Sequence, residues 1–169
     1  MKKYLIIPKE NISRYELEIA RSGCCMSLAP ISFAEDEACY FIERSDPSGC
    51  GSRQFIDSSG NAMFDGYRLL LKYLRTICIS ILDIEDHLIP CEHISLEIDE
   101  ILLVEERAVM QISPSGESFT SSMKKLLENI NEIYPETHAA FLFSRLPGEF
   151  NASKLKKMLI SMELDLHYM

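Results

Sequence analysis

Two histidines flank a short segment that also contains a thiol and a carboxylate. His87 and His93 stand on either side of Cys91 and Glu92. Imidazole, thiolate and carboxylate groups are ligands for zinc, so a metal site built from His87, Cys91, Glu92 and His93 is conceivable. Neighbouring turn residues rarely converge on one tetrahedron. We therefore expect no metal here.

Six cysteines are spread over the chain without a C-x-x-C pair. Cys39 and Cys78 stand in apolar patterns, where a cysteine acts as a small hydrophobic residue. The adjacent Cys24 and Cys25 are a pair that can be reactive, although a structural role is favoured. We expect reduced thiols that are mostly inert rather than a disulfide framework.

Composition and charge limit the classes of partner. The 169 residues are 47% hydrophobic and 25% charged, as in an ordinary globular protein, and we expect one domain. The 17 basic and 26 acidic side chains give a net charge of −9, which disfavours nucleic acid as a partner. The apolar run at residues 4–7 is too short for a signal peptide, and no stretch approaches the length of a membrane helix. We expect a cytoplasmic protein without membrane association.

Apolar periodicity and turn residues predict the elements that position these groups. Ser13 and Glu16 form a capping box, with Ile12 and Leu17 as a hydrophobic staple, at the start of a short helix. Residues 139–143 fit either a strand or a helical turn. The other expected elements are strands at 4–8 and 38–43, a connector at 24–36, a long central helix at 65–87, a β-hairpin of strands at 100–105 and 108–112, and helices at 14–21, 120–134 and 152–162.

The segment at residues 93–103 has the spacing of a protein-kinase catalytic loop. His93 comes first, Leu96 fourth, and an apolar strand follows. With the strand at 38–43, the helix at 69–85 and the strand that ends at 111–114, the chain resembles a reduced protein-kinase fold. More closely, it resembles the uncharacterised kinase-like domain found N-terminal to forkhead-associated domains in some bacterial proteins. It is more distantly similar to the cytoplasmic pseudokinase domain of type VII secretion components.

This resemblance implies that His93 organises its loop through hydrogen bonds. It also implies a small two-lobed α+β fold within a single domain. Residues 1–46 would form an N-terminal lobe, with a sheet and one helix. Residues 47–61 would be a hinge-like linker, because two clusters of turn residues lie there. Residues 62–169 would form a mostly helical C-terminal lobe that contains the β-hairpin.

The chain departs from the kinase pattern at the positions that perform the chemistry. Ser95 stands where a kinase has its catalytic Asp, Glu100 replaces the metal-binding Asn, and Ser113 begins the segment that replaces Asp-Phe-Gly. No Gly-rich loop follows the first strand, and no lysine occurs between Lys9 and Lys72. We therefore expect a pseudokinase without cofactor and without enzymatic activity.

Two functions from different classes remain open. The first is a regulatory or scaffolding module that binds a protein partner, and the sequence indicates neither that partner nor an oligomeric state. Asp83, Glu85 and Asp86 end the long helix, where the helix dipole disfavours acids, so they mark either a partner-binding surface or a solvated helix end. The alternative is a small enzyme, or a domain that binds a nucleotide or other small molecule, with its site in the interlobe cleft near Cys50 and His93.

Overall fold

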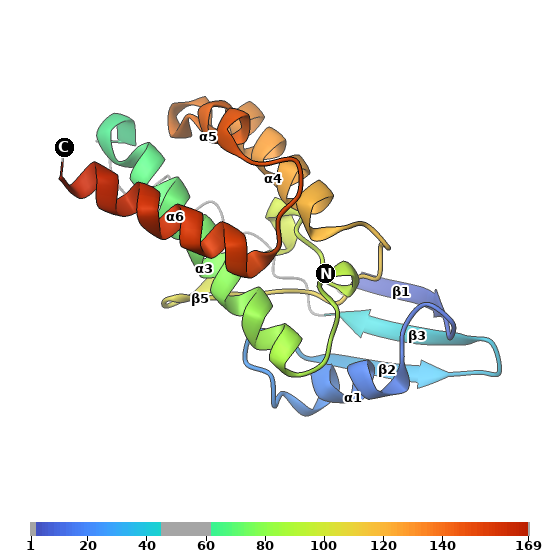
Figure 1. Cartoon of the computed structure of the whole chain (residues 1–169). Helices are drawn as coiled ribbons and strands as arrows, with labels where there is room; N and C mark the ends of the chain where they lie inside the picture. Colours follow the sequence, from blue (N-terminus) through green and yellow to red (C-terminus); the bar gives the residue numbers. More distant parts are fainter. Residues whose placement is uncertain (1–2, 45–61, 169) are drawn as a thin grey trace.

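The N-terminal part of the chain forms a three-stranded antiparallel sheet (Figure 1). The computed structural model describes residues 3–44 and 62–168. Strands β1 (Lys3–Pro8), β2 (Ile31–Glu35) and β3 (Cys39–Arg44) have the order β1-β3-β2. The buried Ile42 of β3 lies opposite Leu5 of β1 and Phe33 of β2, so one face of the sheet enters the core.

The strand β2 corrects the sequence prediction of a connector at residues 24–36. Ile31 is buried and Phe33 is half-buried, whereas Ser32 and Ala34 are exposed, which is the alternation of a strand with one buried face. Asp36 builds the turn that joins β2 to β3, because its carboxylate accepts hydrogen bonds from the backbone N–H groups of Ala38 and Cys39. A five-residue strand with a glycine-free turn gives a weak sequence signal.

Helix α1 (Arg14–Ser22) begins and ends as its sequence predicts. Ser13 is the N-cap, and its hydroxyl accepts a hydrogen bond from the backbone N–H of Glu16, whose carboxylate accepts from the backbone N–H of Ser13. Gly23 ends the helix in the left-handed conformation, at φ 70°. The two staple residues Ile12 and Leu17 are both buried. These contacts confirm the capping box.

Helix α3 (Ala62–Asp86) is the central element of the core. Its buried side chains recur at helical spacing and include Leu70, Leu74, Ile77 and Ile81, each 0% exposed. Helix α6 (Ala152–His167), capped by Asn151, runs antiparallel along α3 (Figure 1). Ion pairing of Arg75 with Glu163, at 2.6 Å between Nε and Oε2, joins the two helices. The predicted central helix is confirmed.

The predicted β-hairpin is present, with shorter strands than expected. Strands β4 (Leu102–Val104) and β5 (Arg107–Val109) pair through a two-residue turn in which Glu105 has φ 57°. Ser80 of α3 accepts a hydrogen bond from the backbone N–H of Ala108 at 3.1 Å, which fixes the hairpin against the central helix. Glu100 is not in a strand, because it ends the short 3-10 helix η2 (Ile98–Glu100).

The remaining helices pack against one another and meet α3 chiefly through the segment between α4 and α5. They are α4 (Phe119–Ile133), the 3-10 helix η3 (Pro135–Thr137) and α5 (Ala139–Arg145), so residues 139–143 are helical rather than a strand. Another 3-10 helix, η1 (Cys91–His93), follows α3. Among residues 3–44 and 62–168, no helix combines the length and apolar composition needed to cross a membrane.

These elements establish an α+β fold with two small sheets. Buried residues of the N-terminal sheet, α3, the β4–β5 hairpin and α4 belong to one hydrophobic cluster. The reduced kinase-like, two-lobed arrangement stays a prediction. The proposed hinge at residues 47–61, including Cys50, lies outside the described residues.

Candidate functional site

His93 joins helix α1 to the loop that follows α3. Its Nδ1 lies 2.5 Å from Oε1 of the buried Glu16, and its backbone carbonyl accepts a hydrogen bond from the N–H of Ser113 at 2.8 Å. These are the contacts expected of a loop organiser, and the role itself stays a prediction. Because Glu16 is also the capping residue of α1, the same carboxylate holds both segments.

Ser95 and Ser113 line one pocket of about 340 Å³. A short antiparallel pairing of residues 93–95 with residues 111–113 brings them together, through the bridge between Ile94 and Ile112. Helix α4 contributes Ser122, Lys125 and Asn129 to its lining. The pocket is lined largely by hydroxyl, amide and charged groups, so it suits a small polar molecule.

Glu100 makes a buried ion pair with Arg44 at the end of β3. Its Oε1 lies 2.8 Å from Arg44 Nη2 and 3.3 Å from Lys3 Nζ, and the Arg44 side chain is 5% exposed. Burial alone would raise the pKa of the Glu100 carboxyl. The hydrogen bond from Ser95 and the positive charges of Arg44 and Lys3 outweigh that effect and lower the pKa. Glu100 therefore holds the N-terminal sheet to the η2 segment as a carboxylate.

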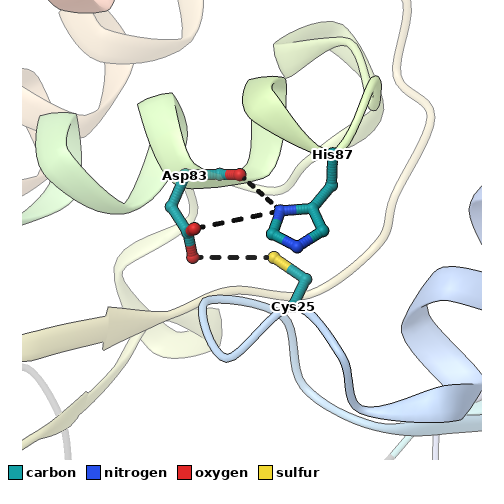
Figure 2. A group of neighbouring side chains, drawn as sticks. All are labelled: Cys25, Asp83 and His87. Carbon is teal, nitrogen blue, oxygen red and sulfur yellow. Dashed lines mark hydrogen bonds and ion pairs between the residues drawn. The ribbon is translucent and has the colours of Figure 1, made fainter.

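Cys25, Asp83 and His87 form a cluster of possible metal ligands (Figure 2). One ligand atom from each residue lies within 4.8 Å of the other two. Cys25 belongs to the loop after α1 and is buried, whereas the Asp83 and His87 side chains at the end of α3 are 39% and 30% exposed. Burial, together with the Asp83 carboxylate, raises the pKa of the Cys25 thiol despite a hydrogen bond from the Ser27 backbone.

No protein-family model matches this sequence, and no curated protein shows significant similarity to it.

The metal site considered in the sequence analysis, formed by His87, Cys91, Glu92 and His93, is not present in the structure. Cys91, Glu92 and His93 are consecutive residues of η1, and side chains in a 3-10 helix point about 120° apart. His93 faces Glu16, while Cys91 Sγ lies 3.6 Å from Glu92 Oε2. Burial, together with Glu92 and Glu85, raises the pKa of the Cys91 thiol to about 12. Within the described residues, His87 is grouped with Cys25 and Asp83 instead.

Only part of this cluster was visible in the sequence. Asp83 and His87 are four residues apart on the last turns of a helix, which places two side chains on one face. Cys25 lies 58 positions from Asp83 and nothing in the local sequence pairs them. The cysteines described by the structure, Cys24, Cys25, Cys39, Cys78 and Cys91, are free thiols.

Proposed function

We propose that this chain is a catalytically inactive, kinase-like module that binds a protein partner through the outer face of its N-terminal sheet. We define that face by Tyr4 and Ile6 of β1 and Phe41 of β3. These side chains are 69%, 68% and 41% exposed. Exposure of three large apolar groups on one face is the single observation that carries the proposal.

The register of the sheet makes this outer face continuous. Ile6 lies directly opposite Phe41, and Phe41 lies opposite Ala34 of β2. Alternate residues of a strand point to the same face, so Tyr4 and Ile6 extend the apolar surface along β1. Scattered apolar side chains are common on protein surfaces, but a contiguous exposed group is typical of an interaction site.

The acidic turn beside this face indicates the chemistry of the partner. Glu35, Asp36 and Glu37 stand at the junction of β2 and β3. Glu35 is paired with Lys9 and Arg14, so Asp36 and Glu37 carry the negative charge of this turn. The backbone hydrogen bonds from Cys39 and Ala38 lower the pKa of Asp36, so this carboxyl group is ionised at neutral pH. A partner with an apolar surface bordered by basic side chains complements both the outer face and this turn, and the net charge of −9 favours its approach.

The positions that correspond to kinase chemistry support a role without catalysis. The Glu100 carboxylate, at the position of a metal-binding Asn, neutralises the buried Arg44. Ser95 donates a hydrogen bond to the same carboxylate, and its hydroxyl also accepts from the backbone N–H of Glu97. Hydroxyl groups engaged in this way stabilise a loop and offer no carboxylate base to an incoming substrate.

A variant pair at the outer face tests the proposal. Ile6→Thr and Phe41→Thr remove apolar surface and keep a residue that favours strands. Ile160→Ala removes similar surface from α6, where Ile160 is 38% exposed, and serves as the control. A partner captured with the wild-type chain is purified, and its affinity for each variant is measured by calorimetry. We expect affinity at least about tenfold weaker for both sheet variants and unchanged for Ile160→Ala.

Two outcomes would contradict the proposed partner. Equal affinity of all variants places the interface elsewhere on the chain. Sedimentation of the wild type as a dimer that Ile6→Thr dissociates would make a second copy the occupant of the outer face.

A pure wild-type sample should show no Mg²⁺-dependent transfer of the ATP γ-phosphate, and transfer that Ser95→Ala abolishes would contradict the inactive assignment.

The polar pocket favours a second candidate, the binding of a small molecule. The observation that supports this candidate is that Ser95, Ser113 and Lys125 line the same pocket. A thermal-shift screen of nucleotides and metabolites, with and without Mg²⁺, separates this candidate from the first. A ligand that stabilises the wild type and fails to stabilise Ser113→Val supports the pocket. The absence of any such ligand leaves the outer face as the functional surface.

A further inference from the structure

The three candidate ligand atoms of Cys25, Asp83 and His87 lie within 4.8 Å of one another, and one of the separations is close to that around a zinc ion. Cys25 Sγ lies 3.7 Å from Asp83 Oδ2. Bond lengths of about 2.3 Å to sulfur and about 2.0 Å to oxygen or nitrogen give ligand separations of about 3.3–3.5 Å in a tetrahedron. A movement of a few tenths of an ångström therefore brings the thiol and the carboxylate to zinc-binding positions.

The imidazole ring of His87 is held in place through its Nδ1. Its Nδ1 lies 2.7 Å from the backbone carbonyl oxygen of Asp83, so Nδ1–H donates a hydrogen bond to that oxygen. The neutral ring then carries its lone pair on Nε2. Metal-binding histidines usually donate their second ring N–H to a carbonyl or carboxylate, because this fixes the tautomer and the ring direction.

The carboxylate of Asp83 is held by a neighbour in the same way. Ser27 donates a hydrogen bond from its hydroxyl to Asp83 Oδ2 at 2.7 Å. Ser27 is 1% exposed, and its backbone carbonyl accepts from the N–H of Met110 at 2.9 Å. Since Cys25 and Ser27 lie on one loop, this backbone bond also positions the thiol.

Helix α1 helps to position His87, the third candidate ligand. The hydroxyl of Tyr15 donates a hydrogen bond to the backbone carbonyl of His87 at 3.0 Å. Figure 2 shows the three side chains turned toward one another, with the Cys25 loop on one side and α3 on the other. Each candidate ligand is thus held by a separate contact, as a preorganised metal site requires.

The charge at this end of α3 also favours a cation. Asp83, Glu85 and Asp86 stand in the last turns, and no basic residue stands in the last turn. The helix dipole places partial negative charge at the same end, so these carboxylates repel it. A divalent cation bound to Asp83 offsets both effects, and the half-exposed Asp83 and His87 give it a path from solvent.

We propose that Cys25 Sγ, the Asp83 carboxylate and His87 Nε2 bind one zinc ion, with water in the fourth position. On binding, the Cys25 S–H bond breaks, its proton passes to solvent, and the thiolate, carboxylate and neutral imidazole each donate an electron pair. No electron transfer occurs. The mixed sulfur, nitrogen and oxygen set selects zinc or cobalt over magnesium and calcium. The ion would hold the loop after α1 to the end of α3, independently of the proposed partner.

Cobalt is the probe for this site because thiolate-bound Co²⁺ absorbs light and Zn²⁺ does not. The full chain, stripped of metal by a chelator, is titrated with Co²⁺ at micromolar concentration. We expect a thiolate-to-cobalt charge-transfer band that saturates at one equivalent and disappears when one equivalent of Zn²⁺ is added. Cys25→Ser replaces sulfur by oxygen at nearly constant shape and should abolish the band. His87→Gln should weaken Zn²⁺ binding by more than about tenfold.

Matched cysteine variants distinguish this site from its neighbours. Cys24→Ser changes an exposed thiol beside Cys25, and Cys91→Ser changes the thiol of the set conceived from the sequence; both should keep the full band. Ser27→Ala should weaken Zn²⁺ binding by about 10- to 100-fold, because it removes the group that orients Asp83. Circular dichroism of each variant confirms the fold. The absence of a band in the wild type, or its loss in Cys91→Ser but not in Cys25→Ser, would overturn the proposal.

Discussion

Oε1 of Glu16 lies 2.5 Å from Nδ1 of His93, although 77 positions separate the two residues in the chain. Oε2 of the same carboxylate accepts hydrogen bonds from the backbone N–H and the hydroxyl of Ser13. One buried side chain therefore caps helix α1 and fixes the loop that leads to Ser95. A local capping motif serves as a long-range contact in the folded protein.

This dual role predicts unequal effects of two variants. Ser13→Ala should lower the free energy of unfolding by about 0.5–2 kcal/mol, as the loss of an N-cap does. Glu16→Ala should cost about 1–3 kcal/mol more, because it also leaves the His93 ring without its partner. Urea denaturation measures both. Glu18→Ala, on the exposed side of α1, is the control and should cost about 1 kcal/mol or less. Equal costs for Ser13→Ala and Glu16→Ala would contradict the linking role.

The central position of α3 predicts a large cost for the loss of a core side chain. Leu74 is 0% exposed, and Leu74→Ala should lower the free energy of unfolding by about 2–5 kcal/mol. Ile79 lies on the same helix and is 44% exposed, so Ile79→Ala should change the free energy of unfolding by about 0.5 kcal/mol. Chemical denaturation monitored by circular dichroism compares the two. Similar values for both variants would place the apolar stripe of α3 outside the core.

The ion pair of Glu100 with Arg44 predicts how stability depends on pH. The folded-state pKa of Glu100 is lowered, so the unfolded chain binds more protons at acidic pH. The stabilisation from Glu100 is thus complete above the ordinary pKa of a glutamate, about 4.3, and is lost as the pH falls through the folded-state value. Glu100→Gln should cost about 3–5 kcal/mol at neutral pH, because it leaves Arg44 buried without its counter-ion.

Denaturation curves at several pH values measure this dependence. The difference between the wild type and Glu100→Gln should shrink as the pH falls below about 4.3, because the wild-type carboxyl then becomes neutral as well. The exposed Glu97, in the same loop, provides the control variant Glu97→Gln, for which we expect a change of about 0.5 kcal/mol. A difference that stays constant down to acidic pH would show that the pair does not stabilise the fold through charge.

The close approach of α3 to η3 predicts that Gly66 tolerates no side chain. A Cβ atom at this position would lie 2.7 Å from the backbone carbonyl oxygen of Glu136. Gly66→Ala should therefore lower the free energy of unfolding by about 1–3 kcal/mol, although alanine favours helices. Gly148 has no atom within 4 Å of such a Cβ, so Gly148→Ala is the matched control and should be nearly neutral. Thermal denaturation compares them, and stabilisation by Gly66→Ala would contradict this contact.

Elements that depend on neighbouring residues can be predicted from the sequence. The capping box of Ser13 and Glu16, the apolar stripe of α3 and the β4–β5 hairpin each need only positions that are close in the sequence. Their geometry follows from local hydrogen bonding and from helical or strand periodicity. The strand β2 was missed because its short alternation and its Asp36 turn resemble a connector.

Which distant side chains meet depends on the tertiary structure and cannot be read from local patterns. Cys25 reaches Asp83 because the loop after α1 pairs through Ser27 with Met110 and so lies against the end of α3. Arg44 reaches Glu100, 56 positions away, because β3 ends beside η2. Such contacts depend on how whole elements pack, and packing is set by the summed burial of many apolar side chains rather than by any local pattern. The candidate ligands Cys25, Asp83 and His87 therefore lie together because packing of the core places the loop after α1 beside the end of α3.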